Sequence, residues 1–186
     1  MDRQYSLTGQ FLLAMPGIGD PRFERSVIAI CAHDSAGAFG LCLHAHVAEL
    51  SVPEMMRELD IDPRATPSVP VLRGGPVEPQ RGFVLHTPDW SEDGTRPVAG
   101  RWALTGTRDV LAAIAEGQGP RQWIVALGYA GWGVNQLDSE LLRHGWLTTP
   151  ASEALLWDTP AAERWVRGFA AEGIDPAMLV ADAGHA

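Results

Sequence analysis

The segment SVIAICAH, residues 26–33, is apolar at successive positions and contains β-branched side chains. A strand that is apolar on both faces is typical of the centre of a sheet, where neither face meets solvent. The turn-forming DSAGAFG follows it, and the apolar run LCLHAHV comes next. If that turn is tight, the two runs pair as a hairpin, so these residues predict the middle of a sheet.

Further strands and helices alternate irregularly along the chain, with hairpins in the first half. Strands are predicted in GQFLLAM, SVPVLRGGPV, RGFVLHT and QWIVALGYAGW. Helices are predicted in SVPEMMRELD, TRDVLAAIAEG, residues 136–144 and TPAAERWVRGFAAEG, each with an apolar stripe at helical spacing. This order favours an α+β domain with a mixed sheet over a doubly wound parallel sheet.

Length and hydropathy restrict the class of protein. A chain of 186 residues is long enough for one compact domain, so a single domain is predicted over residues 1–186. No apolar run approaches the roughly 20 residues that cross a bilayer, and no contact with a membrane is expected. The start, MDRQYSLTGQF, has no basic segment followed by an apolar one, so a signal peptide is not expected. The expected location is the cytoplasm.

All 14 basic residues are arginine, and the formal net charge is −9. Without lysine the chain has no Schiff-base lysine, no lysine general base and no Walker-type phosphate lysine. An acidic balance also opposes binding to the nucleic-acid backbone, which depends on basic groups that displace counterions. Direct binding to nucleic acid is therefore not expected, although a local patch of arginines would permit it.

The stretch GYAGWG, residues 128–133, connects the last apolar strand to the following helix. Its glycines stand in the order G-x-x-G-x-G, the reverse of the dinucleotide fingerprint, and no acidic residue about 20 positions on supports a nucleotide site. We expect Asn135 to cap the helix, with Asp138 completing a capping-box pair. Two interpretations of Tyr129 and Trp132 are open: the side chains pack in the core, or they flank a ligand near the helix N-terminus.

A second glycine turn, RGGPV, covers residues 73–77 and precedes the strand that ends at His86. In one interpretation the turn is a pocket wall and His86 is a general base. In the other, the turn is a connector and the histidine is partly buried. If the two glycine turns line one groove, the candidates for contact with a ligand or partner are Arg73, Gly74, Gly75, Pro76, His86, Gly128, Tyr129, Gly131, Trp132 and Gln136.

Five cysteine and histidine side chains provide a candidate set of soft-metal ligands. On one predicted strand Cys42, His44 and His46 alternate, so they would share a face, as would Cys31 and His33 on the neighbouring strand. The alternative is two buried cysteines and edge histidines, since the spacing matches no standard zinc module. No metal and no other cofactor is therefore expected.

Sequence signatures of catalysis are scarce. There is no serine in a G-x-S-x-G elbow, no H-E-x-x-H and no C-x-x-C. No helix-turn-helix is convincing either, because the helix that ends at Gly145 and the one that starts at Pro160 are separated by about 15 residues, where a turn of 3–4 is needed. The chain is therefore not expected to be an enzyme.

Several motifs occur together in an order that resembles one family. They are AMPGIGDPRF, GAFGLCL, RGGPV, GFVLH and LGYAGWGVNQLDSEL, and with Trp146 they cover nearly the whole chain. In this order they resemble the YqgE/AlgH family of bacterial proteins, with motif positions at Pro16, Asp20, Pro21, Phe23, Gly74, Gly75, Pro76, His86, Gly128, Tyr129, Gly131, Trp132, Gln136 and Leu137. The sequence departs from the family pattern at His44, where an asparagine is common, and at Asn135 and Asp138. The histidine makes the metal hypothesis a property of this chain and not of the family.

The resemblance implies a small cytosolic bacterial protein with a mixed, mainly antiparallel sheet that is curved or barrel-like and flanked by helices. Some members are described as transcriptional regulators, and the resemblance supplies no activity, cofactor or catalytic residue. The function expected for this chain is that of a non-enzymatic regulatory or interaction protein, acting through a protein partner or a small ligand. The alternative is a small-molecule-binding or metal-binding protein, or a hydrolase-like enzyme, with a pocket near the GGPV and GYAGW turns.

Overall fold

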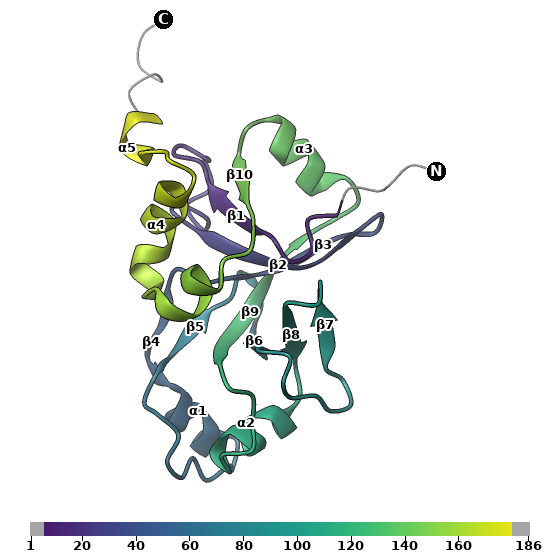
Figure 1. Cartoon of the computed structure of the whole chain (residues 1–186), viewed down its shortest axis with the longest axis vertical. Helices are drawn as coiled ribbons and strands as arrows, with labels where there is room; N and C mark the ends of the chain where they lie inside the picture. The colour runs from purple at the N-terminus through teal and green to yellow at the C-terminus, as the bar shows by residue number, and fades with distance from the viewer. Residues whose placement is uncertain (1–5, 180–186) are drawn as a thin grey trace, which may run out of the picture. The chain divides into compact units, whose positions relative to one another are not determined.

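The computed structural model describes residues 6–179 of the chain (Figure 1). Its contacts divide it into two compact units: unit 1 comprises the described residues up to His44 and from Ala130 onward, and unit 2 comprises Ala45–Tyr129. Strand β9 (Trp123–Trp132) contributes its first part to unit 2 and its last residues to unit 1. The assignment of one family-type domain to residues 1–186 stays a prediction.

Unit 1 contains an antiparallel sheet in the order β10-β1-β2-β3-β9. The predicted hairpin is confirmed, because β2 and β3 pair from Ile28↔Cys42 to Asp34↔Gly37. The first five residues of β2 are buried, as expected for a central strand. Besides the end of β9, the strands are β1 (Phe11–Ala14), β2 (Val27–Asp34), β3 (Gly37–Cys42) and β10 (Trp146–Thr149).

The predicted strand LCLHAHV is wrong beyond Cys42. Strand β3 ends there, and β4 (His46–Ser51) is a separate strand of unit 2. The backbone N–H of Leu43 still donates to the carbonyl oxygen of Val27 in β2 at 2.8 Å, whereas its own carbonyl oxygen accepts a hydrogen bond from Arg164 Nη1 at 2.6 Å. Cys42 and His46 therefore do not lie on one strand.

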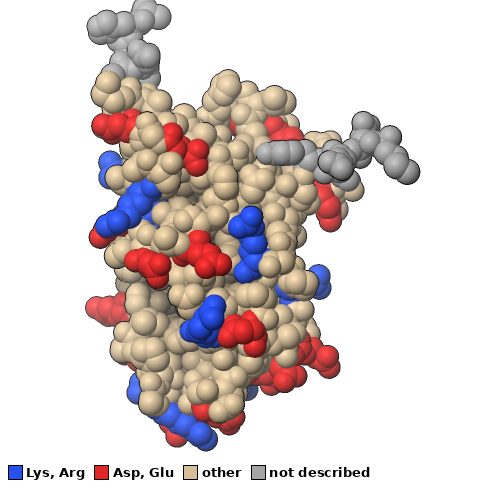
Figure 2. All heavy atoms as spheres, in the orientation of Figure 1, with Lys and Arg blue, Asp and Glu red and all other residues tan. Residues whose placement is uncertain are grey.

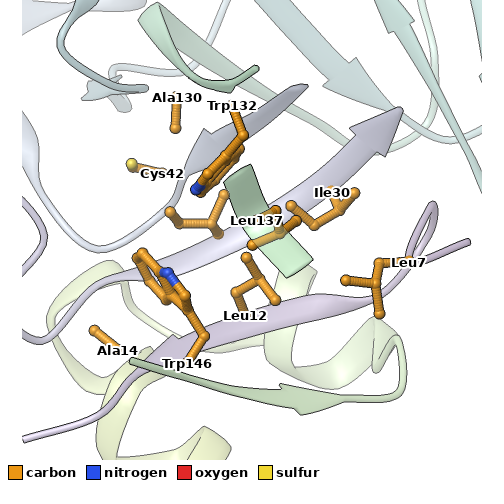
Figure 3. Packing of buried hydrophobic residues seen from close by; sticks show 10 residues of the cluster. Leu7, Leu12, Ala14, Ile30, Cys42, Ala130, Trp132, Leu137 and Trp146 are labelled. Atoms are coloured by element: carbon orange, nitrogen blue, oxygen red, sulfur yellow. The ribbon is translucent and has the colours of Figure 1, made fainter. Parts of the chain in front are cut away.

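A cluster of buried side chains packs on one face of the unit 1 sheet (Figure 3). Helix α3 (Gln136–Leu142) covers this face through Leu137, and the indoles of Trp132 and Trp146 pack edge to face with ring centroids 6.1 Å apart. Alternate residues of each strand reach the cluster, as the strand period of two requires. Its members are Leu7, Leu12, Ala14, Ile28, Ile30, Cys42, Ala130, Trp132, Leu137 and Trp146.

The C-terminal helices pack on the opposite face of the same sheet. A Cβ built on Gly168 would lie 2.8 Å from Leu13 Cδ2, so the helix lies directly against β1. Trp165 is buried beside it and donates a hydrogen bond from Nε1 to the carbonyl oxygen of Ala14 at 2.9 Å. This segment consists of the π-helical turn η1 (Ala154–Asp158), the 3₁₀ turn η2 (Ala161–Glu163), α4 (Arg164–Ala171) and α5 (Pro176–Leu179).

Arg164, the first residue of α4, is buried and has no carboxylate partner among the described residues. Its guanidinium donates to the carbonyl oxygens of Leu43, Leu155 and Leu156 at 2.6, 3.1 and 2.8 Å. Burial lowers the pKa of this guanidinium to about 10. The three carbonyls belong to the residue after β3 and to the irregular turn η1, so the arginine supplies donors that regular backbone pairing does not.

Unit 2 contains a mixed sheet in the order β4-β5-β9-β6-β8-β7. Strand β5 (Pro70–Arg73) runs parallel to β9, and the other pairs are antiparallel. The pairing of β6 with β9 is interrupted between Val77↔Tyr129 and Gly82↔Leu127, so the intervening residues of β6 bulge away from β9. The remaining strands are β6 (Val77–His86), β7 (Arg96–Val98) and β8 (Trp102–Thr105).

Helices α1 (Val52–Glu58) and α2 (Arg108–Ala115) bury their apolar stripes on the unit 2 sheet (Figure 1). Ser51 caps α1, and Glu54 completes a capping box with it. The buried cluster contains Val52, Met55, Met56, Val71, Val84, Val110, Leu111, Ile114, Ala115 and Val125. The predicted α+β class, with a mixed, mainly antiparallel curved sheet flanked by helices, is confirmed.

No helix within residues 6–179 combines the length and the hydropathy that crossing a bilayer requires.

Candidate functional site

The glycines of the two predicted turns meet in unit 2 with their backbones in contact. A Cβ built on Gly74 would lie 2.3 Å from the carbonyl oxygen of Gly128, and one built on Gly128 would lie 2.4 Å from the carbonyl oxygen of Gly75. Gly128 also has φ +76, a conformation that favours glycine. These glycines allow β5, β6 and β9 to approach closely, and their packing leaves no gap for a ligand between them.

The other candidates from the two turns lie elsewhere. Arg73 and Pro76 are exposed in unit 2. Tyr129 is half-buried there, and its ring packs edge to face with Phe83 at a centroid distance of 5.9 Å. Burial of the hydroxyl and the neighbouring Glu78 carboxylate raise the pKa of Tyr129. The remaining three candidates, Gly131, Trp132 and Gln136, belong to unit 1.

Trp132 is a core residue, 7% exposed, and it helps to hold the carboxylate of Glu140. The indole N–H groups of Trp132 and Trp146 both donate to Glu140 Oε2, at 2.9 and 2.8 Å. Gln136 Nε2 donates to Glu140 Oε1 at 3.0 Å. Of the two interpretations of Trp132, the core one is therefore correct. The role of Glu140 as the acceptor of these hydrogen bonds was not predicted. The feature of the sequence that could have indicated it is the position of Glu140 one helical turn after Gln136.

The predicted cap of α3 is wrong. Asn135 has φ 55, in the left-handed region, and its side chain makes no capping hydrogen bond. Gln136 Oε1 instead accepts the backbone N–H of Gly133 at 3.0 Å. Gly133 precedes the helix, so this bond closes the turn before α3 and does not replace a side-chain cap.

His86 is completely buried at the end of β6 within a chain of hydrogen bonds. Nδ1 lies 2.8 Å from the carbonyl oxygen of Thr87, so it carries the proton, and Nε2 accepts from Thr105 Oγ1 at 2.9 Å. Thr95 Oγ1 lies 2.9 Å from Thr105 Oγ1 and accepts the backbone N–H of Glu92 at 3.2 Å. Both ring nitrogens have partners in the neutral form, and burial lowers the pKa of His86.

The Thr105–His86 pair has the spacing of a nucleophile and its general base. Both residues are 0% exposed, however, and the hydroxyl of Thr105 has a second partner in Thr95. Thr105 is one of the residues that line the cavity of unit 2 described below, but its hydroxyl and the His86 ring are closed to solvent and already hydrogen-bonded, so neither is free to react with a molecule in the cavity. The arrangement favours a structural role for His86 over the general-base interpretation.

Stability is expected to fall below pH 6.5 because of His86. Since its pKa is lowered in the folded protein, the unfolded chain binds the proton more readily. Its stabilising contribution is complete above the ordinary value of 6.5 and is lost as pH falls through the folded pKa. His86→Gln should therefore show a flatter change of urea midpoint between about pH 7 and 5 than the wild type. The exposed His46→Gln is the control, and equal slopes for wild type and His86→Gln would contradict the prediction.

A cavity of about 420 Å³ is formed within unit 2 by α1, α2 and the sheet. This volume lies within the range of roughly 300–1,000 Å³ that is typical of small-molecule sites. The side chains that line its interior are largely apolar and come from four separate elements. They include Met55, Leu59, Phe83, Leu111, Val125 and Leu127.

The rim of this cavity is polar, with Glu58, Gln80, Thr107 and Arg108. None of the predicted candidates lines the cavity. Two features of the sequence coincide with the lining of the cavity: Gly82, a glycine inside a predicted strand, and the polar segment TGTR before a predicted helix. Neither signal specifies a ligand site without the fold.

The five metal-ligand candidates are not gathered into one site. Cys31 and Cys42 are buried, and burial raises the pKa of each thiol to about 12. His33 Nδ1 accepts a backbone N–H at 3.1 Å, so this nitrogen already has a partner. His46 is exposed in unit 2, whereas His44 belongs to unit 1. In the described part of the chain, no group of three or more His, Cys, Asp or Glu side chains could hold a metal ion.

A second cavity, of about 320 Å³, is lined by the single loop Gly17, Ile18, Gly19, Asp20, Pro21 and Glu24 of unit 1. The carboxylate of Asp20 is paired with Arg22 at 2.7 Å, and this partner lowers the pKa of the carboxyl. Because consecutive residues of one exposed loop form this hollow, the unit 2 cavity is the stronger candidate site.

These features define an α+β protein with a mixed sheet and a ligand-sized cavity in one of its two units. The AlgH-like family (DUF179) matches the chain over residues 11–177. The chain is 52% identical over 186 residues to a UPF0301 protein of Rhizorhabdus wittichii, with 100% of both covered. It is 51% identical over 179 residues to a UPF0301 protein of Sphingopyxis alaskensis, with 96% of each covered. The chain therefore belongs to the AlgH-like family, and the predicted resemblance is confirmed.

Two solved structures are similar. The solution structure of the AlgH protein from Pseudomonas aeruginosa has 39% sequence identity and a TM-score of 0.80, with 100% of this chain and 99% of that chain covered. The crystal structure of a protein from Corynebacterium diphtheriae has 22% sequence identity and a TM-score of 0.75, with 96% of this chain and 94% of that chain covered. This second protein is similar in fold.

Proposed function

We propose that this chain is a non-enzymatic regulatory protein that acts in the cytoplasm by binding a small ligand in the cavity of unit 2. The cavity carries the proposal: it has a volume of about 420 Å³, an apolar interior and a polar rim. Concave sites of this size and polarity are the usual sites of small ligands. A protein partner that recognises the occupied form would then transmit the signal.

The surroundings of the cavity support binding over catalysis. Thr105 lines the cavity, but its side chain and the imidazole of His86 are 0% exposed and hydrogen-bonded to each other. The groups at the rim are a guanidinium, a carboxylate, an amide and a hydroxyl, which orient a ligand through hydrogen bonds. No group that attacks a substrate is needed to explain this arrangement.

The charge distribution supports indirect regulation and not direct binding to DNA. The formal net charge is −9 and the chain has no lysine. On the face shown in Figure 2, acidic side chains lie among the arginines, so the described residues there do not form a continuous basic surface. Binding to the phosphate backbone requires such a surface.

Filling the cavity is expected to abolish ligand binding while the fold is retained. Gly82 lines the cavity, and a Cβ built on it would have Leu127 Cδ2 as its nearest neighbour, at 3.8 Å. Gly82→Leu should therefore change the free energy of unfolding by less than about 1 kcal/mol. A fragment library screened by ligand-observed NMR measures binding to the wild type and to the variant.

Gly133→Leu in unit 1 is the matched control, because its Cβ also has room, with Gln136 Oε1 at 3.9 Å as the nearest atom. Fragments that bind the wild type and Gly133→Leu but not Gly82→Leu support the proposal. If no fragment binds, or if binding is unaffected by Gly82→Leu, the cavity is not the ligand site.

A further inference from the structure

Two side chains of opposite charge flank the mouth of the unit 2 cavity. Glu58, the last residue of α1, and Arg108, the first residue of α2, both line it. Arg108 Nη2 donates a hydrogen bond to the carbonyl oxygen of Leu59, the residue after Glu58. This bond holds the guanidinium beside the C-terminal end of α1.

The two charges do not neutralise each other. The carboxylate of Glu58 has no hydrogen bond or ion pair with any residue that the structure describes, and the guanidinium of Arg108 has only Leu59 as a partner there. The carboxylate oxygens and the remaining guanidinium N–H groups are therefore available to a ligand. Both residues are exposed, so a ligand reaches them from solvent.

The interior behind this pair of charges offers no charged partner. Phe83, Leu111 and Val125 line it and are 5%, 5% and 2% exposed. An apolar group that enters the cavity is removed from water, which favours binding in proportion to the apolar area buried. The cavity therefore combines an apolar interior with one positive and one negative group at its mouth.

We infer that the ligand is a zwitterionic α-amino acid with an apolar side chain, an inference that rests on the function proposed above. The α-carboxylate binds Arg108, the α-ammonium binds Glu58, and the side chain enters the apolar interior. Charge complementarity favours this zwitterion over ligands with a single charge. A lone carboxylate is repelled by Glu58, and a lone amine is repelled by Arg108.

Calorimetric titration of the full chain compares L-leucine and L-phenylalanine with two analogues of phenylalanine. Phenylalaninamide keeps the ammonium and lacks the carboxylate, and N-acetylphenylalanine keeps the carboxylate and lacks the ammonium. Each analogue is expected to bind about tenfold more weakly than phenylalanine, because one charge-assisted hydrogen bond is lost. L-glutamate, whose side chain does not suit the apolar interior, is expected to show no binding.

Variants of the two charged residues test which ligand group each one binds. Glu58→Gln should bring the affinity for N-acetylphenylalanine close to that for phenylalanine, while phenylalaninamide still binds more weakly. Arg108→Gln should bring the affinity for phenylalaninamide close to that for phenylalanine, while N-acetylphenylalanine still binds more weakly. If Glu58 and Arg108 had only a structural role, their variants would be less stable but would discriminate between the two analogues as the wild type does. Glu116→Gln and Arg101→Gln, exposed in the same unit and outside the cavity lining, are the matched controls and should bind phenylalanine like the wild type.

The outcomes separate this inference from the proposed function. If both analogues bind as tightly as phenylalanine and Gly82→Leu abolishes all three, the cavity is a ligand site and the zwitterion inference is overturned. The inference is also overturned if fragments bind the cavity and no amino acid does. If neither fragments nor amino acids bind, the proposed function fails as well.

Discussion

Gly128→Ala is expected to lower the free energy of unfolding by more than about 4 kcal/mol. The residue has φ +76, and the added methyl group would lie 2.4 Å from the carbonyl oxygen of Gly75 and 3.1 Å from that of Val77. Both oxygens belong to the backbone, so rotation of a side chain does not relieve the clash. Denaturation by guanidinium chloride, followed by tryptophan fluorescence, measures the loss.

Gly117→Ala provides the control for backbone conformation alone. Gly117 has a similar φ, +72, but no atom lies within 4 Å of its built Cβ. The expected cost is about 1–2 kcal/mol, the cost of the left-handed conformation for a residue with a side chain. Equal losses for the two variants would contradict the close approach of Gly128 to Gly75.

Arg164→Met is the second change with a large expected effect, a loss of about 3–5 kcal/mol. Methionine retains much of the buried apolar stem but leaves the carbonyl oxygens of Leu43, Leu155 and Leu156 without the donors described above. Buried carbonyls that lose their partners carry the full cost of desolvation. Chemical denaturation of the two proteins gives the difference in the free energy of unfolding.

Arg167→Met is the matched control on the same helix. Arg167 is exposed and pairs with Glu163 at 2.7 Å, and exposed pairs of this kind contribute little. The expected change is within about 0.5 kcal/mol. If Arg164→Met cost no more than Arg167→Met, the three carbonyl contacts would not stabilise the fold.

The parts of the fold that local patterns specify were predicted from the sequence. Hairpin β2–β3 follows from two apolar runs and a short turn, and α1 follows from an apolar stripe at helical spacing. The end of β3 at Cys42 was not predicted, and the side chain that binds the next carbonyl, that of Leu43, belongs to Arg164, which is 121 residues away. At Asn135 local capping preference was misleading, because the residue has a left-handed backbone conformation, φ 55, and its side chain makes no capping hydrogen bond.

The candidate site was harder to predict than the fold for a related reason. The glycine turns are prominent in the sequence, but their contact depends on the pairing of β5 with β9, which no local pattern specifies. The cavity draws on α1, β6, α2 and β9, so no short motif marks it. Buried His86 shows the same difficulty, since its partner Thr105 is distant in sequence and its neutral form depends on that partner.

The division of the chain into two units also constrains the order in which its parts can fold during synthesis on the ribosome. Unit 2 is one continuous segment, Ala45–Tyr129, so all the residues it needs have been synthesised once Tyr129 is added. Unit 1 waits longer, because β1 pairs with β10 and is covered by α4, both of which come near the end of the chain. Until then the apolar faces of β1, β2 and β3 lack the side chains that bury them. A nascent chain of this protein therefore offers chaperones its N-terminal segment first, and for the longest time.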